Sequence, residues 1–178
     1  MRKITLLCAA VLLLSMAVVA QDKTADFSGD WVLDTEKSEL GGRRRIKSMK
    51  MKVTQTETEL SYTREVEREA GGGGRGGRMG RGRGMGGNQT STFDLTGKER
   101  IEPSEGRGGD VKLKAEEDGA GFKLTQSREF NGPMGAVTII TIEKWSLSED
   151  GSTFTVQSDT ETPRGTRSST LVFTKVVE

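Results

Sequence analysis

The segment VKLKAE, residues 111–116, alternates apolar and charged side chains, and this alternation decides the fold class. Val111, Leu113 and Ala115 share one face of an extended chain, and two lysines share the other. Successive side chains of a β-strand point to opposite faces, so the segment predicts a half-buried strand.

The same two-residue period recurs along the chain, while helical periodicity is weak. The last such run places Leu171, Phe173 and Val177 on one face. The longest run, at 137–147, is apolar on both faces, so we expect it to be a central strand. The further runs are KMKVTQ (50–55), ELSYTREVE (59–67), TSTFDL (90–95), FKLTQSREF (122–130), VTIITIEKWSL (137–147), STFTVQS (152–158) and TLVFTKVV (170–177).

Short polar segments separate these runs and suit tight reversals, because Gly, Asn and Asp tolerate positive φ. They are TETE (56–59), LTGK (95–98), EDGAG (117–121), NGPMG (131–135) and EDGS (149–152). Short connections join neighbouring strands antiparallel. The sequence therefore predicts an all-β, up-and-down meander of eight to ten strands, closed into a barrel that buries its apolar face and removes its edges.

The first twenty residues have the organisation of a secretory signal peptide. Arg2 and Lys3 precede an apolar run of about sixteen residues, shorter than the ~20 that span a bilayer, and small residues end at Ala20. We expect Sec-type export to the periplasm or outside the cell, cleavage after Ala20, and no membrane span afterwards. Residues 21–178 then form one domain, which we expect to be monomeric.

The composition excludes several kinds of active site. The chain has no histidine, and its one cysteine, Cys8, lies in the predicted signal, so neither a disulfide nor a Ser-His or Cys-His site can form. We predict no catalysis, no cofactor and no metal. A hydrolase with paired carboxylates would need two of them buried face to face, and the sequence selects no such pair. The formal net charge of +1 argues against a specific nucleic-acid binder.

The segment DFSGDWVLDTEKSEL, residues 26–40, resembles the start of lipocalins and related calycin barrels. Gly29 and Trp31 match the Gly-x-Trp motif of the first strand, and the final hairpin is similar to that of small secreted bacterial lipocalin-like proteins, a largely uncharacterised group. The resemblance implies that a basic residue of the last strand covers Trp31, with Lys175 the first candidate and Arg167 the second. The C-terminal helix and the disulfides common in lipocalins are missing from the pattern.

The resemblance further implies a binding protein that holds a small apolar or amphipathic ligand inside the barrel. Arg128 shares a face with apolar neighbours, so it would anchor a carboxylate if that face is inside and be a surface residue if it is outside. Alternatively, the large side chains fill the barrel, and the protein is an envelope interaction module that acts through its surface. The predicted inward positions are Tyr62, Phe93, Phe122, Leu124, Arg128, Ile140, Ile142, Phe154 and Phe173.

The segment 71–87, GGGGRGGRMGRGRGMGG, consists of glycine, arginine and two methionines. Glycine loses the most chain entropy on ordering, so we predict a disordered loop between two strands. Alternatively, its arginines make weak, salt-sensitive contacts with an anionic polymer or surface, or fold back on the acidic strand before it. Binding of Cu(I) by two methionines alone would be poor. A second basic cluster, at 43–45, would extend the positive patch if it lay at the same end of the barrel. The arginines of the segment are Arg75, Arg78, Arg81 and Arg83.

Overall fold

The computed structural model describes residues 24–41, 46–68, 89–103, 108–132 and 135–177. Their regular structure is entirely β, and in these ranges no helix is long and apolar enough to cross a membrane. The predicted signal peptide and the Gly/Arg-rich segment lie outside them. The ten strands are β1 (Gly29–Leu33), β2 (Ile46–Gln55), β3 (Glu59–Arg68), β4 (Gln89–Asp94), β5 (Arg100–Glu102), β6 (Gly108–Asp118), β7 (Gly121–Gly132), β8 (Gly135–Leu147), β9 (Thr153–Thr162) and β10 (Gly165–Lys175).

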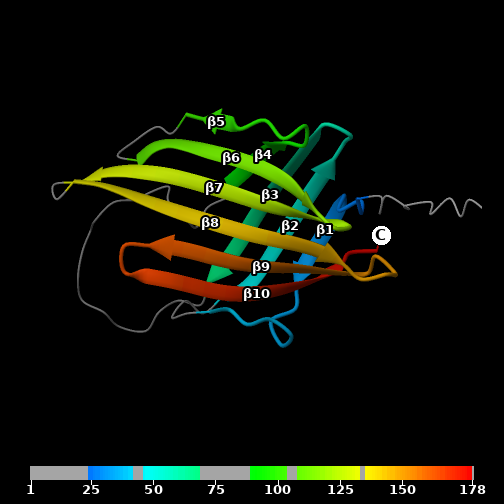
Figure 1. Ribbon diagram of the computed structural model, residues 1–178. Coiled ribbons are helices and arrows are strands. Elements are labelled where there is room, and N and C mark those ends of the chain that lie inside the picture. Colours follow the sequence, from blue (N-terminus) through cyan, green and yellow to red (C-terminus); the bar gives the residue numbers. More distant parts are fainter. Residues whose placement is uncertain (1–23, 42–45, 69–88, 104–107, 133–134, 178) are drawn as a thin grey trace, which may run out of the picture.

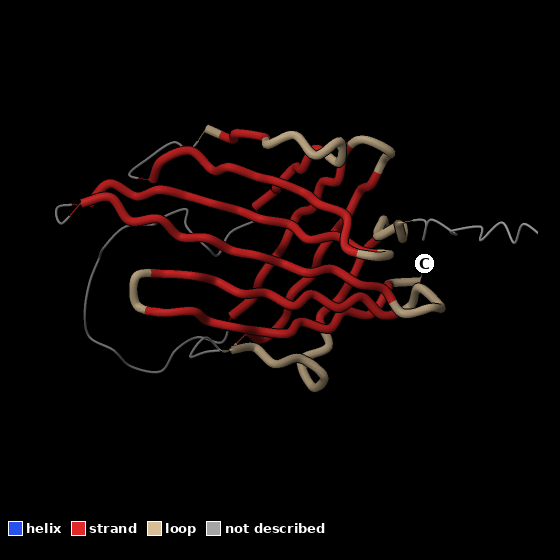
Figure 2. Tube along the Cα trace, viewed as in Figure 1, coloured by secondary structure: helices blue, strands red, loops and turns tan. Residues whose placement is uncertain are grey.

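All ten strands belong to one antiparallel sheet in the order β4-β3-β2-β1-β10-β9-β8-β7-β6-β5. Figure 1 shows β6 to β10 side by side, with β1 to β4 crossing behind them at a steep angle, and Figure 2 shows that strands make up most of the described chain. Strands that follow one another in sequence pair with each other, except β4 and β5, and β1 pairs with β10. This confirms the predicted all-β, up-and-down meander.

The barrel is nearly closed, and its two edge strands are β4 and β5. Among the described residues these edges share no strand pairing, but the Thr92 amide donates a hydrogen bond to Glu102 Oε1 at 3.2 Å. A carboxylate thus covers part of an exposed edge, which protects it from pairing with other chains. The short β5, with Ile101 56% exposed, was not predicted from the sequence.

The alternation that predicted the strands becomes the two faces of the sheet. Val111, Leu113 and Ala115 are buried inside the barrel, whereas Lys112 on the same strand is exposed. Strand β8 is the longest and is paired on both sides, which agrees with its apolar run. One expectation is wrong: Val177 lies beyond the end of β10 and is 89% exposed.

Two glycines of the β6–β7 hairpin are required by its geometry. Gly119 has φ +62°, a conformation that side chains disfavour. A Cβ on Gly121 would lie 2.0 Å from the Trp145 carbonyl oxygen of β8, so only glycine permits this close approach. The hairpin at 117–121 therefore forms where the sequence predicts it.

The barrel has two distinct ends. The β2–β3, β6–β7 and β8–β9 turns lie at one of them, on the right in Figure 1, which we call the plugged end because Phe27 fills it. At the opposite end, on the left, β3 ends at Arg68 and β10 begins at Gly165. Inside the barrel, aromatic residues form one layer at the plugged end, and polar residues form a second layer toward the opposite end.

Candidate functional site

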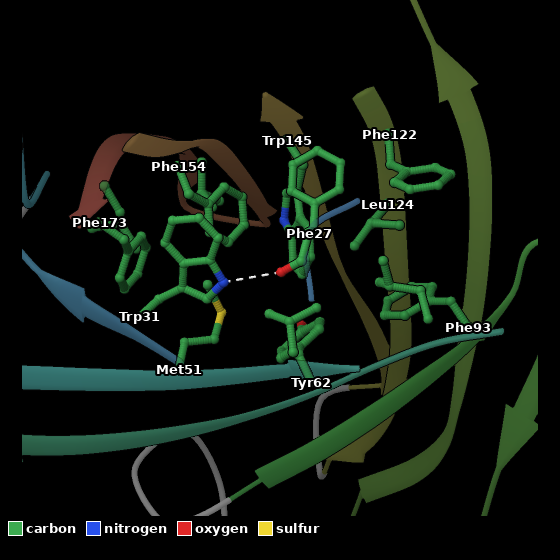
Figure 3. Close-up of a cluster of buried hydrophobic side chains, with 14 of the residues drawn as sticks. Phe27, Trp31, Met51, Tyr62, Phe93, Phe122, Leu124, Trp145, Phe154 and Phe173 are labelled. Atoms are coloured by element: carbon green, nitrogen blue, oxygen red, sulfur yellow. Dashed lines mark hydrogen bonds between the residues drawn. The ribbon is translucent and has the colours of Figure 1, made fainter. Parts of the chain in front are cut away.

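The plugged end is packed with aromatic side chains around Phe27, which precedes β1 and is fully buried (Figure 3). Its ring centroid lies 5.7 Å from that of Phe122, 5.6 Å from Trp145 and 5.2 Å from Phe154. Aromatic contacts at these distances and burial of these rings stabilise the core. This half of the interior is filled by side chains.

Hydrogen bonds fix the segment that carries Phe27. Its amide donates to Gln55 Oε1 at 3.0 Å, and its carbonyl accepts from Trp31 Nε1 at 3.0 Å. The Gln55 amide group returns a bond to the Ala25 carbonyl, and the Ala25 amide donates to the Ala120 carbonyl. The segment is thus tied to β1, β2 and the β6–β7 turn, and its buried backbone groups are satisfied.

The Gly-x-Trp residues lie beside this plug. Trp31 is 1% exposed and is opposite Lys175 in the β1–β10 pairing, and Lys175 Nζ lies 5.3 Å from the Trp31 ring. Gly29 has φ +136°, and a Cβ there would lie 3.0 Å from Lys175 Cε. A basic side chain of the last strand therefore covers the tryptophan, and this residue is Lys175 rather than Arg167.

Farther along the barrel the interior becomes polar, and a buried ion pair crosses it. Arg64 Nη1 donates to Glu143 Oε1 at 2.8 Å and Nη2 to Oε2 at 2.7 Å, with side chains 20% and 7% exposed. Trp145 Nε1 donates to Glu143 at 3.0 Å, and the guanidinium lies 4.6 Å from the Tyr62 ring centroid. This bidentate geometry satisfies both charges at the boundary between the two layers.

The two partners shift each other's ionisation. Burial by itself would raise the pKa of Glu143, but the charge of Arg64 and the hydrogen bonds from Arg64 and Trp145 outweigh it and lower this pKa. Burial would lower the pKa of Arg64, and the charge of Glu143 raises it instead. Both groups are therefore charged at neutral pH.

A second polar cluster lies next to the ion pair. Gln126 Nε2 donates to the Tyr62 hydroxyl at 3.0 Å and to Ser91 Oγ at 3.1 Å. Burial, followed by the negative charge of Glu143, raises the pKa of Tyr62 to about 12. The phenol is therefore neutral at physiological pH and acts as a hydrogen-bonding group.

Arg128 lies on the inner face of β7, two residues beyond Gln126. It is opposite Ile139 of β8, and its guanidinium carbon lies 5.6 Å from the Phe130 ring centroid. Its Nε atom is buried. Of the two alternatives that the sequence left open for Arg128, the structure shows the inward one.

Hydroxyl side chains continue this inner face on β8, β9 and β10. Thr141 and Thr160 lie opposite each other with their hydroxyl oxygens 3.3 Å apart, and Ser158 lies opposite Ser169. All four are half-buried. The opposite end of the barrel thus combines a cation with hydroxyl groups and a few apolar side chains.

Six of the predicted binding residues are buried aromatic or apolar core residues. They belong mostly to the filled half of the barrel, where they pack against one another, and any contact of theirs with a ligand stays a prediction. They are Tyr62, Phe93, Phe122, Leu124, Phe154 and Phe173.

The expected inward orientation of Ile140 and Ile142 is wrong. Glu143 and Trp145 are buried and point inward, so Thr141 shares their face and the two isoleucines lie on the outer one. Ile142 is opposite Thr125 of β7 and Asp159 of β9. Both faces of this strand are apolar in sequence, so hydrophobicity alone could not select the inner one.

Sequence reasoning missed Arg64, Glu143 and Phe27. The signal for the first two was the one that identified Arg128, a charge on the apolar face of a predicted strand. Arg64 shares a face with Leu60, and Glu143 interrupts an apolar run. Phe27 lies between the predicted signal and the first strand, where periodicity gives no signal.

The arginines at 75, 78, 81 and 83 lie outside the described residues, as does the cluster at 43–45. The strand ends that flank them are close together, because Ile46 pairs with Arg68. Both basic segments therefore join the described chain at the opposite end of the barrel.

Comparison with known proteins finds similar solved structures, one of which is a binding protein from zebrafish. Zebrafish ileal bile acid-binding protein complexed with cholic acid matches with a TM-score of 0.45 and 13% sequence identity, covering 84% of this chain and 98% of that chain. No protein-family model matches the chain, and no curated protein is significantly similar to it. The fold assignment rests on the strand order and pairing described above.

Proposed function

We propose that this chain is a non-catalytic binding protein whose ligand is a small amphipathic molecule with an anionic group. The observation that carries the proposal is the inward position of Arg128, opposite Ile139 and beside the Phe130 ring, on the inner face that also carries the hydroxyl of Thr141. A guanidinium binds a carboxylate through paired, charge-assisted hydrogen bonds. Neighbouring apolar groups would contact the rest of the ligand.

The site lies in the polar half of the interior, since aromatic rings occupy the plugged half. The ion pair of Arg64 with Glu143 lies at the boundary between the two halves. We assign Arg128 to the ligand's anionic group because it lies on the inner face of β7 in this polar half, opposite Ile139.

The carboxylates support a non-catalytic role. Among the described residues Glu143 is the one buried carboxylate, and it is bound by Arg64 and Trp145. A hydrolase of the paired-carboxylate type requires a second carboxylate facing it. The described interior offers Glu143 a guanidinium instead.

Native mass spectrometry of the protein purified from its own source tests whether a small molecule accompanies it. Titration with dodecanoate and the uncharged dodecanol then tests the charge preference. We expect dodecanoate to bind, and Arg128→Gln to weaken it on the order of tenfold, because a charge-assisted pair is lost. Lys112→Gln, which removes a cation from the outer face of β6, should leave binding unchanged. Equal binding of both probes, or no effect of Arg128→Gln, would overturn the proposal.

A second candidate function is an interaction module that binds anionic polymers through its basic segments. It is favoured by the packed aromatic half and by the attachment of both basic segments at one end of the barrel. Heparin serves as the probe. Loss of heparin binding on deletion of residues 71–87, with dodecanoate binding absent in the intact protein, would favour this function over the first.

Export through the predicted signal peptide is part of the proposal. It is supported by residues 1–20 of the sequence, where a basic start, an apolar run and small residues that end at Ala20 follow one another. N-terminal sequencing of the mature protein from fractionated cells should begin at Gln21. Full-length protein in the cytoplasm would argue against export.

A further inference from the structure

A cleft of about 460 Å³ opens at the plugged end, on the far side of the aromatic core from Arg128. Four parts of the chain form it: the segment before Phe27, the β2–β3 turn, the end of β4, and the β6–β7 hairpin. They come together only through the closure of the barrel. The cleft is therefore separate from the polar interior in which the proposed ligand would lie.

The floor of the cleft is apolar. Phe122 is 3% exposed and contacts Phe27 from within the core, and its ring also lines the cleft. Leu95, half-buried against the same core, lines the other side. A small apolar group entering the cleft would contact these two side chains rather than water.

Three carboxylates surround this floor: Asp26, Glu57 and Glu117. Glu117 is opposite Phe122 in the β6–β7 pairing, so the two side chains share the inner face at the end of the barrel. Thr24 Oγ1 donates a hydrogen bond to Glu117 at 3.1 Å, and the Ser28 amide donates one to Asp26 at 2.9 Å. These bonds hold two of the carboxylates in place.

No lysine or arginine lines the cleft among the described residues. The nearby cations Lys114 and Lys123 bind Glu116, which points to the outer face of the same hairpin. Nor do the carboxylates come together as a metal-binding group in the described ranges. An organic cation would complement this cleft, because its apolar part would contact the floor and its positive charge would lie near the separate carboxylates.

We propose that this cleft binds a small organic ammonium ion that carries an apolar chain. The ammonium group lies among Glu117, Glu57 and Asp26, and the chain lies against Phe122 and Leu95. Because the carboxylates are exposed, the attraction weakens as salt is added.

Hexylammonium chloride is the probe, with hexanol and hexanoate as matched comparisons. Two-dimensional NMR of the full chain measures the affinity and locates the site. We expect saturable shifts at Leu95, Glu117 and Phe122 with hexylammonium, binding at least several-fold weaker with hexanol, and none with hexanoate. Equal affinity for the ammonium and the alcohol, or shifts centred elsewhere, would overturn the proposal.

Glu117→Gln removes the charge with almost no change of shape and should weaken hexylammonium binding on the order of tenfold. Glu149→Gln, in the β8–β9 turn outside the cleft, is the matched control and should bind as the unaltered chain does. Leu95→Lys places a cation in the cleft and should abolish binding, with a preserved NMR spectrum as evidence that the barrel is intact. Unchanged binding in both cleft variants would refute the site.

This site is independent of the proposed function. Arg128→Gln should leave hexylammonium binding unchanged, and Glu117→Gln should leave dodecanoate binding unchanged. If either ligand fails to bind, the result for the other still stands.

Discussion

The two halves of the barrel interior are built by the same strands with opposite chemistry. On β3, Tyr62 belongs to the aromatic layer, whereas Arg64, one inward position farther, belongs to the ion pair. On β8, Trp145 and Glu143 make the same transition within two residues. The boundary between apolar and polar layers therefore runs across the strands rather than between them.

This difference teaches that inward orientation does not fix the role of a side chain. The plugged half buries ring surface and stabilises the fold through the hydrophobic effect. The polar half buries charges, which is unfavourable unless they are paired and hydrogen-bonded. The first half is thus the source of stability, and the second is the place where a ligand's polar groups find partners.

Removal of the plug is the largest expected perturbation of this contrast. Phe27→Ala deletes a ring that is fully buried among three aromatic neighbours. We expect the free energy of unfolding to fall by about 3–5 kcal/mol, measured by urea denaturation. Val32→Ala, on the partly exposed outer face of β1, should lower the free energy of unfolding by much less. Similar losses in both variants would mean that Phe27 is not a core residue.

Replacing both partners of the ion pair should destabilise the protein less than replacing one of them, whereas the loss of a buried ring is not recovered in this way. Arg64→Met leaves Glu143 buried without its counter-ion and should cost about 3–5 kcal/mol of unfolding free energy. Adding Glu143→Leu should recover most of this loss, because neither charge then remains buried. A double-mutant cycle by urea denaturation measures the coupling. Additive losses would contradict the pairing.

The pH dependence of the pair has a defined sign. The pKa of Glu143 is lower in the folded chain than in the unfolded chain, because the charge and hydrogen bonds of Arg64 and Trp145 outweigh burial. Its contribution is therefore fully present above the unfolded pKa of about 4.3 and is lost as the pH falls through the lower folded value. Urea midpoints measured below pH 4 should decline less in the double variant than in the unaltered chain.

Tyr62, the single tyrosine, reports the environment of the boundary directly. Its pKa is raised to about 12 by burial and by the charge of Glu143, so absorbance at 295 nm after a rapid pH jump should show a midpoint near that value. In urea the midpoint should return to about 10. Since the folded pKa is the higher one, the contribution to stability is present below pH 10 and is lost as the pH rises through 12. A folded midpoint near 10 would show that water reaches the hydroxyl.

The smallest effect on stability is expected from the Gly/Arg-rich segment, which belongs to neither half of the barrel interior. Deleting residues 71–87 and joining β3 to β4 by a short turn should change the free energy of unfolding by less than about 1 kcal/mol, because the entropy of loop closure depends only weakly on length. The Arg64–Gln89 pair of β3 and β4, whose two residues lie on either side of the segment, stays intact. Thermal denaturation measures the change, and a large drop in melting temperature would show that the segment packs on the barrel.

Much of the fold was determined by the sequence alone, because strand formation and tight turns depend on neighbouring residues. The alternation at 111–116 assigned the buried face of β6, and the glycines at 117–121 assigned the hairpin after it. The same local rule places Arg128 on a face with apolar residues but does not tell whether that face is inside the barrel. The rule could not identify the inner face of β8, because Ile140 on one face and Trp145 on the other are both apolar.

Contacts across the interior were decided only by the tertiary structure. Arg64 and Glu143 are 79 residues apart, and they meet because closure of the sheet brings β3 opposite β8. Phe27 enters the core from a segment without periodicity, and the cleft beside it is assembled from four separate parts of the chain. A strand's two-residue period is a property of its own backbone, whereas these contacts depend on the curvature and order of the whole sheet.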